Sequence, residues 1–277
     1  MTGPRTGPSR VAVLGTGVDA VSMGAAVERC GQAVERRGYL SVGMLNAAKA
    51  VAMRRDEALR GAVRGCDLVL ADGQSVVWAA RAAGCRLPER VAGIDLFTEL
   101  LAVASARGYR VYFLGARPEV LGRMLAVLGN RYPGLVVAGA QDGYFDPEDE
   151  AVIAEKIRLC QPDLLFIGMS SPRKEIFAAR WGRATGARVV HGVGGSFDVL
   201  AGVTRRAPQW WQRHGLEWLF RAIQEPARLG RRYLATNAVF AALAAGQALR
   251  ARAGRFAGDR GQASGPADPA PWKEDRA

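Results

Sequence analysis

Short apolar runs alternate with amphipathic segments along residues 11–200. Runs of β-branched and aliphatic residues predict strands, and apolar residues that recur every three or four positions predict helices. Strands are expected over residues 11–14, 39–45, 67–71, 109–114, 135–140, 163–168 and 188–191. Helices are expected over residues 21–37, 47–64, 74–84, 95–107, 119–131, 147–159 and 174–185, with another from about 196. The alternation predicts an α/β fold class, a mostly parallel sheet with helices on both faces.

The pattern changes beyond residue 204. Leu216, Leu219, Phe220 and Ile223 fall on one face of a helix that Pro226 is expected to end. A basic and apolar segment follows, and the Gly/Pro-rich composition of both chain ends predicts disorder. The expected division is a disordered start (1–9), an α/β catalytic core (10–203), a basic amphipathic C-terminal appendage (204–255) and a disordered tail (256–277).

Charge is concentrated in the appendage. The net charge is +12, and residues 203–255 hold ten arginines against two glutamates. Such a segment predicts an anionic partner, either nucleic acid or the inner face of a membrane. No run of about 18 apolar residues is present, so no membrane span is expected. Four widely spaced cysteines without a CxxC pair, and no apolar secretory stretch at the start, fit a cytosolic protein with reduced thiols.

Polar groups follow several of the expected strands. They occur at Asn46, Asp72, Tyr144, residues 170–175 and residues 194–198. Because parallel strands end at one edge of their sheet, these groups are expected to converge on one crevice. Asp72 is a candidate base, and Arg90, Arg173 and Lys174 are candidate phosphate-binding cations. His191 abuts a buried strand, which favours a structural role, and no metal-ligand cluster is present.

One stretch has the layout of an anion site. Residues 189–208 begin with an apolar run, break at Gly192, Gly194 and Gly195, and then start a helix. Glycines let the backbone approach a phosphate, and a helix N-terminus adds partial positive charge. A plain strand-to-helix turn is the alternative. The first strand precedes a similar run, GTGVDAV, but Ala20 stands where a dinucleotide-binding pattern needs glycine, so no cofactor is expected there.

Several motifs together resemble the WecG/TagA/CpsF family of glycosyltransferases, over residues 10–240. They are DG at 72–73, RVAGIDL at 90–96, GYF at 143–145, GMSSPRKE at 168–175, GVGGSFDVLAG at 192–202, RRAP at 205–208 and LEWLFR..QEPARLGRRY at 216–233. The resemblance implies a Rossmann-like core and a C-terminal appendage that closes the site and meets the membrane. It also implies transfer of N-acetylmannosamine, or its uronate, from a UDP-sugar donor to a polyprenyl-diphosphate-linked sugar, in cell-surface polysaccharide synthesis.

The resemblance also implies residue roles. Asp72 matches the proposed general base, and one carboxylate without a second nucleophile suits a single displacement with inversion. Arg90 matches a residue that stabilises the leaving diphosphate. Matching substrate-binding positions are Asn46, Gly73, Tyr144, Pro172, Lys174, Glu175, Gly194, Gly195 and Asp198, with Tyr144 and Asp198 at the uracil. Many members have Thr in place of Met44 and Gln in place of Lys174, which leaves the donor sugar open.

In the appendage, four arginines are expected to meet the acceptor's pyrophosphate and the membrane: Arg221, Arg228, Arg231 and Arg232. A surface helix with solvated arginines is the alternative. The expected location is cytoplasmic, peripheral on the inner face of the cell membrane, with self-association possible. Two other functions stay open: a nucleotide-sugar binding protein without turnover, and a nucleic-acid-binding module, although no RRM, KH or helix-turn-helix pattern is present.

Overall fold

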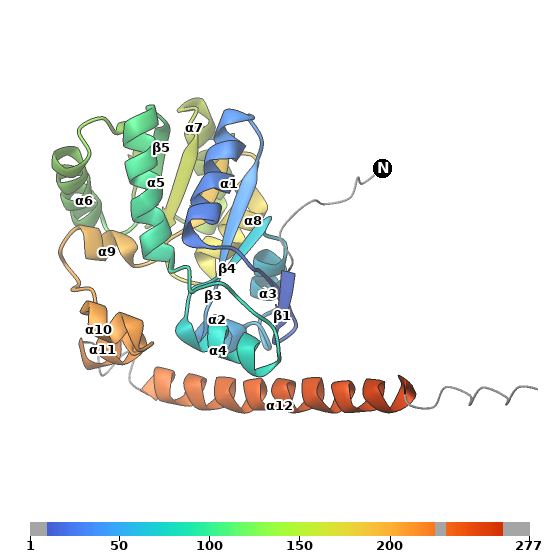
Figure 1. Ribbon diagram of the computed structural model, residues 1–277. Coiled ribbons are helices and arrows are strands. Elements are labelled where there is room, and N and C mark those ends of the chain that lie inside the picture. Colours follow the sequence, from blue (N-terminus) through green and yellow to red (C-terminus); the bar gives the residue numbers. More distant parts are fainter. Residues whose placement is uncertain (1–9, 225–230, 263–277) are drawn as a thin grey trace, which may run out of the picture.

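A computed structural model describes residues 10–224 and 231–262, with the side chains of 221, 231–235 and 254–262 left undescribed. Its centre is a parallel sheet of six strands in the order β4–β3–β8–β7–β5–β6. The strands are β3 (Leu40–Leu45), β4 (Leu68–Ala71), β5 (Arg110–Gly115), β6 (Val136–Gln141), β7 (Leu164–Gly168) and β8 (Val189–Gly192). Figure 1 shows this sheet between helices, so the predicted α/β class is confirmed.

Helices connect the strands and cover both faces of the sheet (Figure 1). Those up to the end of β8 are α1 (Met23–Glu35), α2 (Ala47–Ala52), α3 (Glu57–Arg64), α4 (Gln74–Ala82), α5 (Gly93–Arg107), α6 (Pro118–Arg131), the short 3-10 helix η1 (Pro147–Asp149), α7 (Glu150–Leu159) and α8 (Arg173–Trp181). After β8 come α9 (Ser196–Leu200), α10 (Gln209–Arg213), α11 (Glu217–Gln224) and α12 (Arg231–Gln262).

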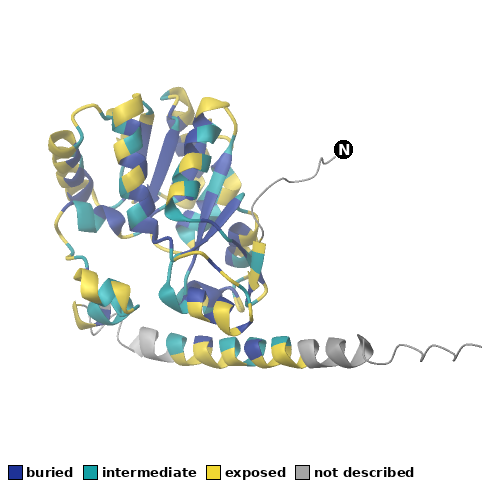
Figure 2. Cartoon of the chain, viewed as in Figure 1, coloured by how far each residue is buried: buried dark blue, intermediate teal, exposed yellow. Residues whose placement is uncertain are grey.

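The two faces of the sheet bury alternate residues of the same strands. On one face, Phe113 and Phe166 pack with Phe97 of α5 and with residues of α1 and α6. On the other, Leu165 and Ile167 pack with α7 and α8. The inner strands are therefore buried on both sides, as Figure 2 shows, which accounts for their continuous apolar runs, while the edge strand β6 has no fully buried residue.

Two glycines let β5 and β7 approach closely at the place in the sheet where successive connections start to lead in opposite directions. The loop after β5 leads outward to β6, and the loop after β7 leads the opposite way to β8. Ligands bind α/β sheets beside such a switch point. Gly115 (φ +132°) and Gly168 are register partners there, and a Cβ on Gly115 would lie 2.5 Å from the Gly168 carbonyl carbon. Side chains at either position would overlap neighbouring atoms.

The first strand does not join the parallel sheet, contrary to the predicted alternation from residue 11. β1 (Arg10–Val13) and β2 (Thr16–Asp19) form a separate antiparallel hairpin. Gly15 supplies the left-handed turn (φ +77°). The Asp19 carboxylate accepts a hydrogen bond of 2.7 Å from the Val69 amide, so the hairpin covers the outer edge of β4. The GTGVDAV stretch that was compared with a dinucleotide-binding motif is therefore the turn and second strand of a hairpin that covers the edge of the sheet.

The helix predicted over residues 47–64 is two helices. α2 ends near Met53, and Asp56 then caps α3 by accepting a hydrogen bond of 2.8 Å from the Leu59 amide. This capping bond starts a new helix at Glu57. The apolar spacing continues across the break, so the spacing alone predicts one helix. The expected helix around residues 216–223 is likewise preceded by a separate short helix, α10, and Gly215 (φ +70°) separates the two.

The last helix lies across the core rather than apart from it. α12 runs alongside α2 and α4 (Figure 1). Phe240 is buried in the cluster formed by those helices, and the Gln247 side chain bonds the Leu14 amide and the Ala12 carbonyl of the hairpin. The helix continues to Gln262, beyond the predicted appendage boundary at 255, while Pro226 lies outside the described residues. No helix in the described ranges is long and apolar enough to cross a membrane.

The close approach at the switch point can be tested with Gly168→Ala. The new Cβ would overlap the Phe197 ring. Overpacking of this kind costs about 1–3 kcal/mol, so the free energy of unfolding in a urea titration should fall by that amount. Gly122→Ala, in α6 with open space around it, is the control and should be neutral or stabilising. Equal stability of both variants would contradict the steric argument.

Candidate active site

Strand register brings Asn46 and Asp72 together. β3 and β4 are in parallel register up to Leu45 and Ala71, and the Asp72 amide donates to the Leu45 carbonyl at 2.9 Å. The next residues along both strands, Asn46 and Asp72, therefore lie side by side. The Asn46 amide nitrogen is 3.3 Å from Asp72 Oδ2, and its Oδ1 caps α2 by accepting from the Lys49 amide. Asn46 thus both starts a helix and orients a carboxylate.

The second oxygen of Asp72 is held by a helix N-terminus. Asp72 Oδ1 accepts a hydrogen bond of 2.9 Å from the amide of Gly93, the first residue of α5. The N-cap residue Ala92 has no side chain that could cap this helix, so the Asp72 carboxylate takes that role from another strand. The helix dipole favours a negative charge at this point. Asp72 is half-buried and has both oxygens hydrogen-bonded.

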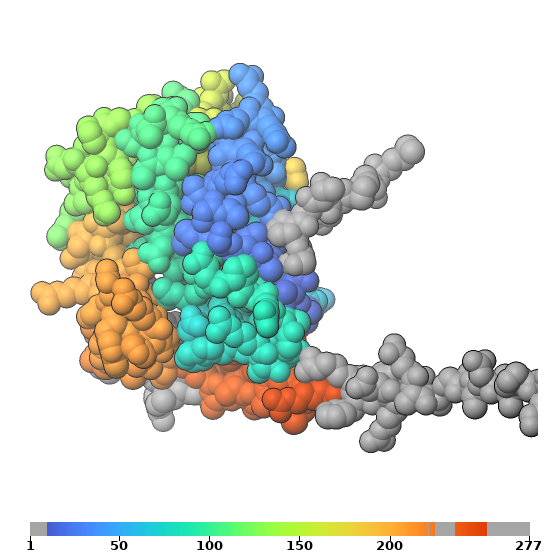
Figure 3. All heavy atoms as spheres, in the orientation of Figure 1, coloured from blue at the N-terminus to red at the C-terminus, as the bar shows by residue number. Residues whose placement is uncertain are grey.

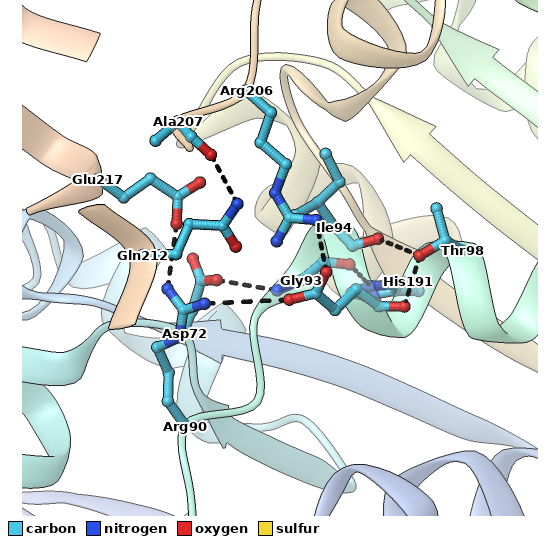
Figure 4. Close-up of polar contacts among 11 residues, drawn as sticks. Asp72, Arg90, Gly93, Ile94, Thr98, His191, Arg206, Ala207, Gln212 and Glu217 are labelled. Atoms are coloured by element: carbon cyan, nitrogen blue, oxygen red, sulfur yellow. Dashed lines mark hydrogen bonds and ion pairs between the residues drawn. The ribbon is translucent and has the colours of Figure 1, made fainter. Parts of the chain in front are cut away.

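Four charged side chains surround the approach to Asp72 (Figure 4). Arg90 Nη1 is 3.0 Å from the Glu217 carboxylate of α11, and its Nη2 is 3.9 Å from Asp95. Asp95, in the first turn of α5, pairs with Arg206 Nη1 at 2.6 Å. The core and the C-terminal segment therefore share one charge network.

An open cavity of about 490 Å³ lies beside this network. It is lined by Gln74, Glu89, Arg90, Asp95, Arg206, Gln209, Gln212 and Arg213. Two of its walls come from segments far apart in the sequence, because Gln74 begins α4 and Gln209 begins α10. In Figure 3 the orange surface of the C-terminal segment adjoins the cyan surface that contains α4. The lining offers amides, carboxylates and guanidinium groups, and few apolar side chains.

A buried ion triad lies on the other side of Asp72. Glu175 Oε1 is 2.8 Å from Lys49 Nζ and 2.9 Å from Lys174 Nζ, and all three side chains are buried. Burial alone would raise the pKa of Glu175, but the two ammonium groups outweigh it and lower the pKa to about 2. Burial, followed by the charge of Lys49, lowers the pKa of Lys174. The triad has one more positive than negative charge.

Lys174 connects this triad to the glycine turn. A Cβ on Gly194 would lie 3.8 Å from Lys174 Nζ, and one on Gly192 would lie 3.2 Å from its Cδ. Gly194 has a left-handed φ of +56°, as a tight turn requires. Lys174 is also close enough to Asp72 for the carboxylate to raise its pKa. The carboxylate and the glycine turn are thus on either side of one ammonium group.

Tyr144 and Asp198 lie around a different arginine. Tyr144 is 69% exposed, and its hydroxyl accepts a hydrogen bond of 3.4 Å from Arg117 Nε. Asp198, in α9, is near enough to raise the pKa of Arg117. Arg117 is at the N-cap position of α6, two residues after the end of β5, and its side chain makes no capping bond. These three residues form an open polar edge beyond the switch point.

The remaining predicted site residues have local structural positions. Gly73 is the N-cap of α4, and Pro172, which follows a cis peptide bond, is the N-cap of α8. Arg173 is not available as a free cation, because its guanidinium donates to the Gly143 and Phe145 carbonyls and stacks on the Phe145 ring. It fixes the loop that presents Tyr144.

The four appendage arginines cannot be assigned contacts. Arg228 lies outside the described residues, and the side chains of Arg221, Arg231 and Arg232 are not described. Among the described residues of this segment, Arg206 and Arg213 line the cavity, and the expected set included neither. Arg206 also joins the charge network through Asp95. Its only sequence signal is its place in RRAP, next to Arg205.

Three other site residues were missed. Lys49 fell within a predicted helix, Gly93 lay in the loop and RVAGIDL motif before the helix predicted from residue 95, and His191 was expected to be structural, so none of the three was given a role at the site. In the structure Lys49 neutralises Glu175, Gly93 bonds Asp72, and His191 bonds Gly93. Each contact joins residues more than 20 positions apart, so local spacing gives no sign of it.

A comparison with known families identifies the family of the chain. The family model described as "Glycosyl transferase WecG/TagA/CpsF family" matches residues 11–254, which is most of the chain. The chain belongs to this family and is a glycosyltransferase. The predicted resemblance is therefore confirmed.

The triad makes a testable contribution to stability. Glu175→Gln would leave two buried ammonium groups without a countercharge, and we expect a loss of about 3–5 kcal/mol in unfolding free energy at pH 7. Glu155→Gln, which breaks an exposed pair with Arg158, is the control and should cost less than about 1 kcal/mol.

The same pair of variants has a pH signature. Because the folded-state pKa of Glu175 is depressed to about 2, its contribution is present above the unfolded pKa of 4.5 and is lost as pH falls towards 2. Urea titrations should therefore show the gap between wild type and Glu175→Gln narrowing below pH 4.5. A gap that stays constant down to pH 2.5 would contradict the ion-pair account.

Proposed function

We propose that this glycosyltransferase moves an N-acetylhexosamine-type sugar, N-acetylmannosamine or its uronate, from a UDP-sugar to a polyprenyl-diphosphate-linked acceptor sugar. The reaction inverts the anomeric centre and serves cell-surface polysaccharide or teichoic acid-type synthesis. Family membership supports a nucleotide-sugar donor and a sugar acceptor. The observation that carries the proposal is the Asp72 carboxylate, held by two donors between a polar cavity and a cationic glycine turn.

Asp72 serves as the general base. Its carboxylate takes the proton from an acceptor hydroxyl while that oxygen forms a bond to the anomeric carbon, and the bond from this carbon to the UDP oxygen breaks. One attacking oxygen and one leaving oxygen on opposite sides give inversion. The bonds from Asn46 and Gly93 leave a lone pair of each oxygen free for this proton.

The leaving diphosphate is stabilised best by cations that are already in place, because these need not rearrange as its negative charge develops. The surplus charge of the buried triad lies at Lys174, beside the glycine turn. Arg90 faces the site from the opposite side, where Glu217 and Asp95 now hold its guanidinium. We place the diphosphate between these cations, in a metal-independent reaction, with the uracil towards Tyr144 and Asp198.

The cavity beside Arg90 and Arg206 suits the acceptor. The amide side chains of Gln74, Gln209 and Gln212 can bond sugar hydroxyls, and the arginines can meet a pyrophosphate. The cavity opens next to α10 and α11, which carry the exposed apolar side chains of Trp210 and Ile223. Apolar groups among arginines favour docking at an anionic membrane surface. The enzyme would then act from the cytoplasmic side as a peripheral protein.

The base role predicts the behaviour of Asp72→Asn. The amide keeps an oxygen for the Gly93 bond but cannot take a proton, so kcat should fall by about 10²–10⁴-fold. UDP affinity, measured by calorimetry, should change by less than about twofold because the diphosphate site is intact. The assay is release of UDP from a panel of UDP-sugars with a synthetic prenyl-diphosphate sugar. Asp146→Asn, on an exposed turn, is the control.

Two outcomes would contradict this assignment. Near wild-type transfer by Asp72→Asn would remove the base role. If the wild-type protein binds UDP but releases none from any donor, it is a nucleotide-sugar binding protein without turnover.

Membrane docking is tested on the full chain. Replacing Arg221, Arg228, Arg231 and Arg232 with glutamine should lower co-sedimentation with anionic vesicles at least tenfold, since each arginine near the surface is worth about 1 kcal/mol. Replacing Arg36, Arg37, Arg54 and Arg55 changes the net charge equally on other exposed segments and should have little effect. Equal loss in both variants would mean general charge attraction. Binding to DNA that the first variant loses would favour the nucleic-acid alternative.

A further inference from the structure

A histidine lies beneath the proposed base. His191 is on β8, fully buried, with Val42 of β3 and Phe166 of β7 as its register partners. Its ring packs edge-on against Phe166, at 6.2 Å between ring centroids. The neighbouring side chains on this face of the sheet are apolar. A polar ring at this position therefore costs desolvation that an apolar residue would avoid.

The ring makes one hydrogen bond, and its chemistry fixes the tautomer. Nε2 is 3.2 Å from the Gly93 carbonyl oxygen, while Nδ1 is buried without a hydrogen-bonding partner among the described residues. Burial lowers the pKa of His191 to about 4, so the ring is neutral at pH 7. A carbonyl oxygen only accepts, so the single proton is on Nε2 and is donated to Gly93.

Gly93 needs an anchor of this kind. It is the first residue of α5, it has no side chain, and the N-cap Ala92 makes no capping bond. The amide of the same glycine donates to Asp72 Oδ1. The position of the first turn of α5 relative to β4 therefore decides how the Gly93 amide points at the Asp72 carboxylate. His191 ties this turn to β8, in the interior of the sheet.

We propose that His191 is a positioning residue for catalysis, which holds the Gly93 backbone so that its amide orients the Asp72 carboxylate towards the acceptor hydroxyl. Figure 4 shows Asp72, Gly93 and His191 in sequence from the cavity to the sheet. His191 itself touches no substrate. The inference rests on the proposed role of Asp72 as the base.

Charged groups from several elements lie around Asp72. Lys174 of α8 and Arg206, before α10, are close enough for the Asp72 carboxylate to act on them, and Arg90, Asp95 and Glu217 lie at its approach. If Gly93 loses its anchor, the amide bond to Asp72 loosens while these charged groups stay. The carboxylate then loses its orientation towards the acceptor hydroxyl, so kcat should fall while UDP affinity is kept.

The test compares three variants in the full-length protein. His191→Leu removes the donor, His191→Gln keeps a nitrogen donor at the Nε2 position, and Val189→Ala makes a packing defect on the same strand and face. For His191→Leu we expect kcat to fall about tenfold or more, with UDP affinity within twofold. His191→Gln should restore kcat, and Val189→Ala should lower stability without lowering kcat.

A second measurement does not depend on turnover. Hydrogen exchange of the peptide that contains Gly93 should speed up about tenfold in His191→Leu and return towards wild type in His191→Gln. If His191→Leu does not fold, His191→Asn replaces it, because its shorter side chain cannot reach the Gly93 carbonyl.

The outcomes separate the two proposals. Unchanged kcat or unchanged Gly93 exchange in His191→Leu would overturn the positioning role, as would an equal loss of kcat in Val189→Ala. An active Asp72→Asn would overturn the base assignment instead, and Gly93 exchange would still show whether His191 holds the backbone.

Discussion

The hydrogen bond between the Gly93 amide and the Asp72 carboxylate is the contact on which the site depends. It joins the end of β4 to the start of α5, so a carboxylate acts as the cap of a helix to which it is not connected locally. The same first turn carries Asp95, which holds Arg206 and approaches Arg90. The position of one helix end therefore sets both the proposed base and the cations around it.

The cations of the site are held by carboxylates rather than by solvent. Glu175 holds two lysines in the interior, and Asp95 and Glu217 hold two arginines at the cavity. A buried charge without a partner is costly, so such pairing is what permits several cations to lie close together before any anion binds. The pairing also fixes their direction. An incoming diphosphate then meets oriented charges, at the cost of competing with the carboxylates already present.

Much of this arrangement follows from the sequence, for identifiable reasons. Buried parallel strands leave continuous apolar runs, and the ends of such strands share an edge, so the sheet and the pairing of Asn46 with Asp72 could be predicted. The hairpin at the N-terminus could not, because residues 10–19 give only one short apolar run. Contacts such as Arg90 with Glu217 also leave no local signal, since they join segments more than 100 residues apart. Family resemblance supplied roles for Asp72 and Arg90 but not for the groups that orient them.

The two outer strands of the sheet are protected by different means. Beside β4, the hairpin occupies the Val69 amide through Asp19, and Gln247 of α12 holds the hairpin in turn. At the other edge, the register between β6 and its neighbour β5 shifts between Val111 and Tyr112. Such an irregularity twists the outer strand β6 away from the flat geometry that another strand could pair with. Open edges recruit foreign strands and lead to aggregation. A protein that lost α12 would keep Asp72 but leave the hairpin over β4 less firmly held, so we expect it to aggregate more readily than the full chain.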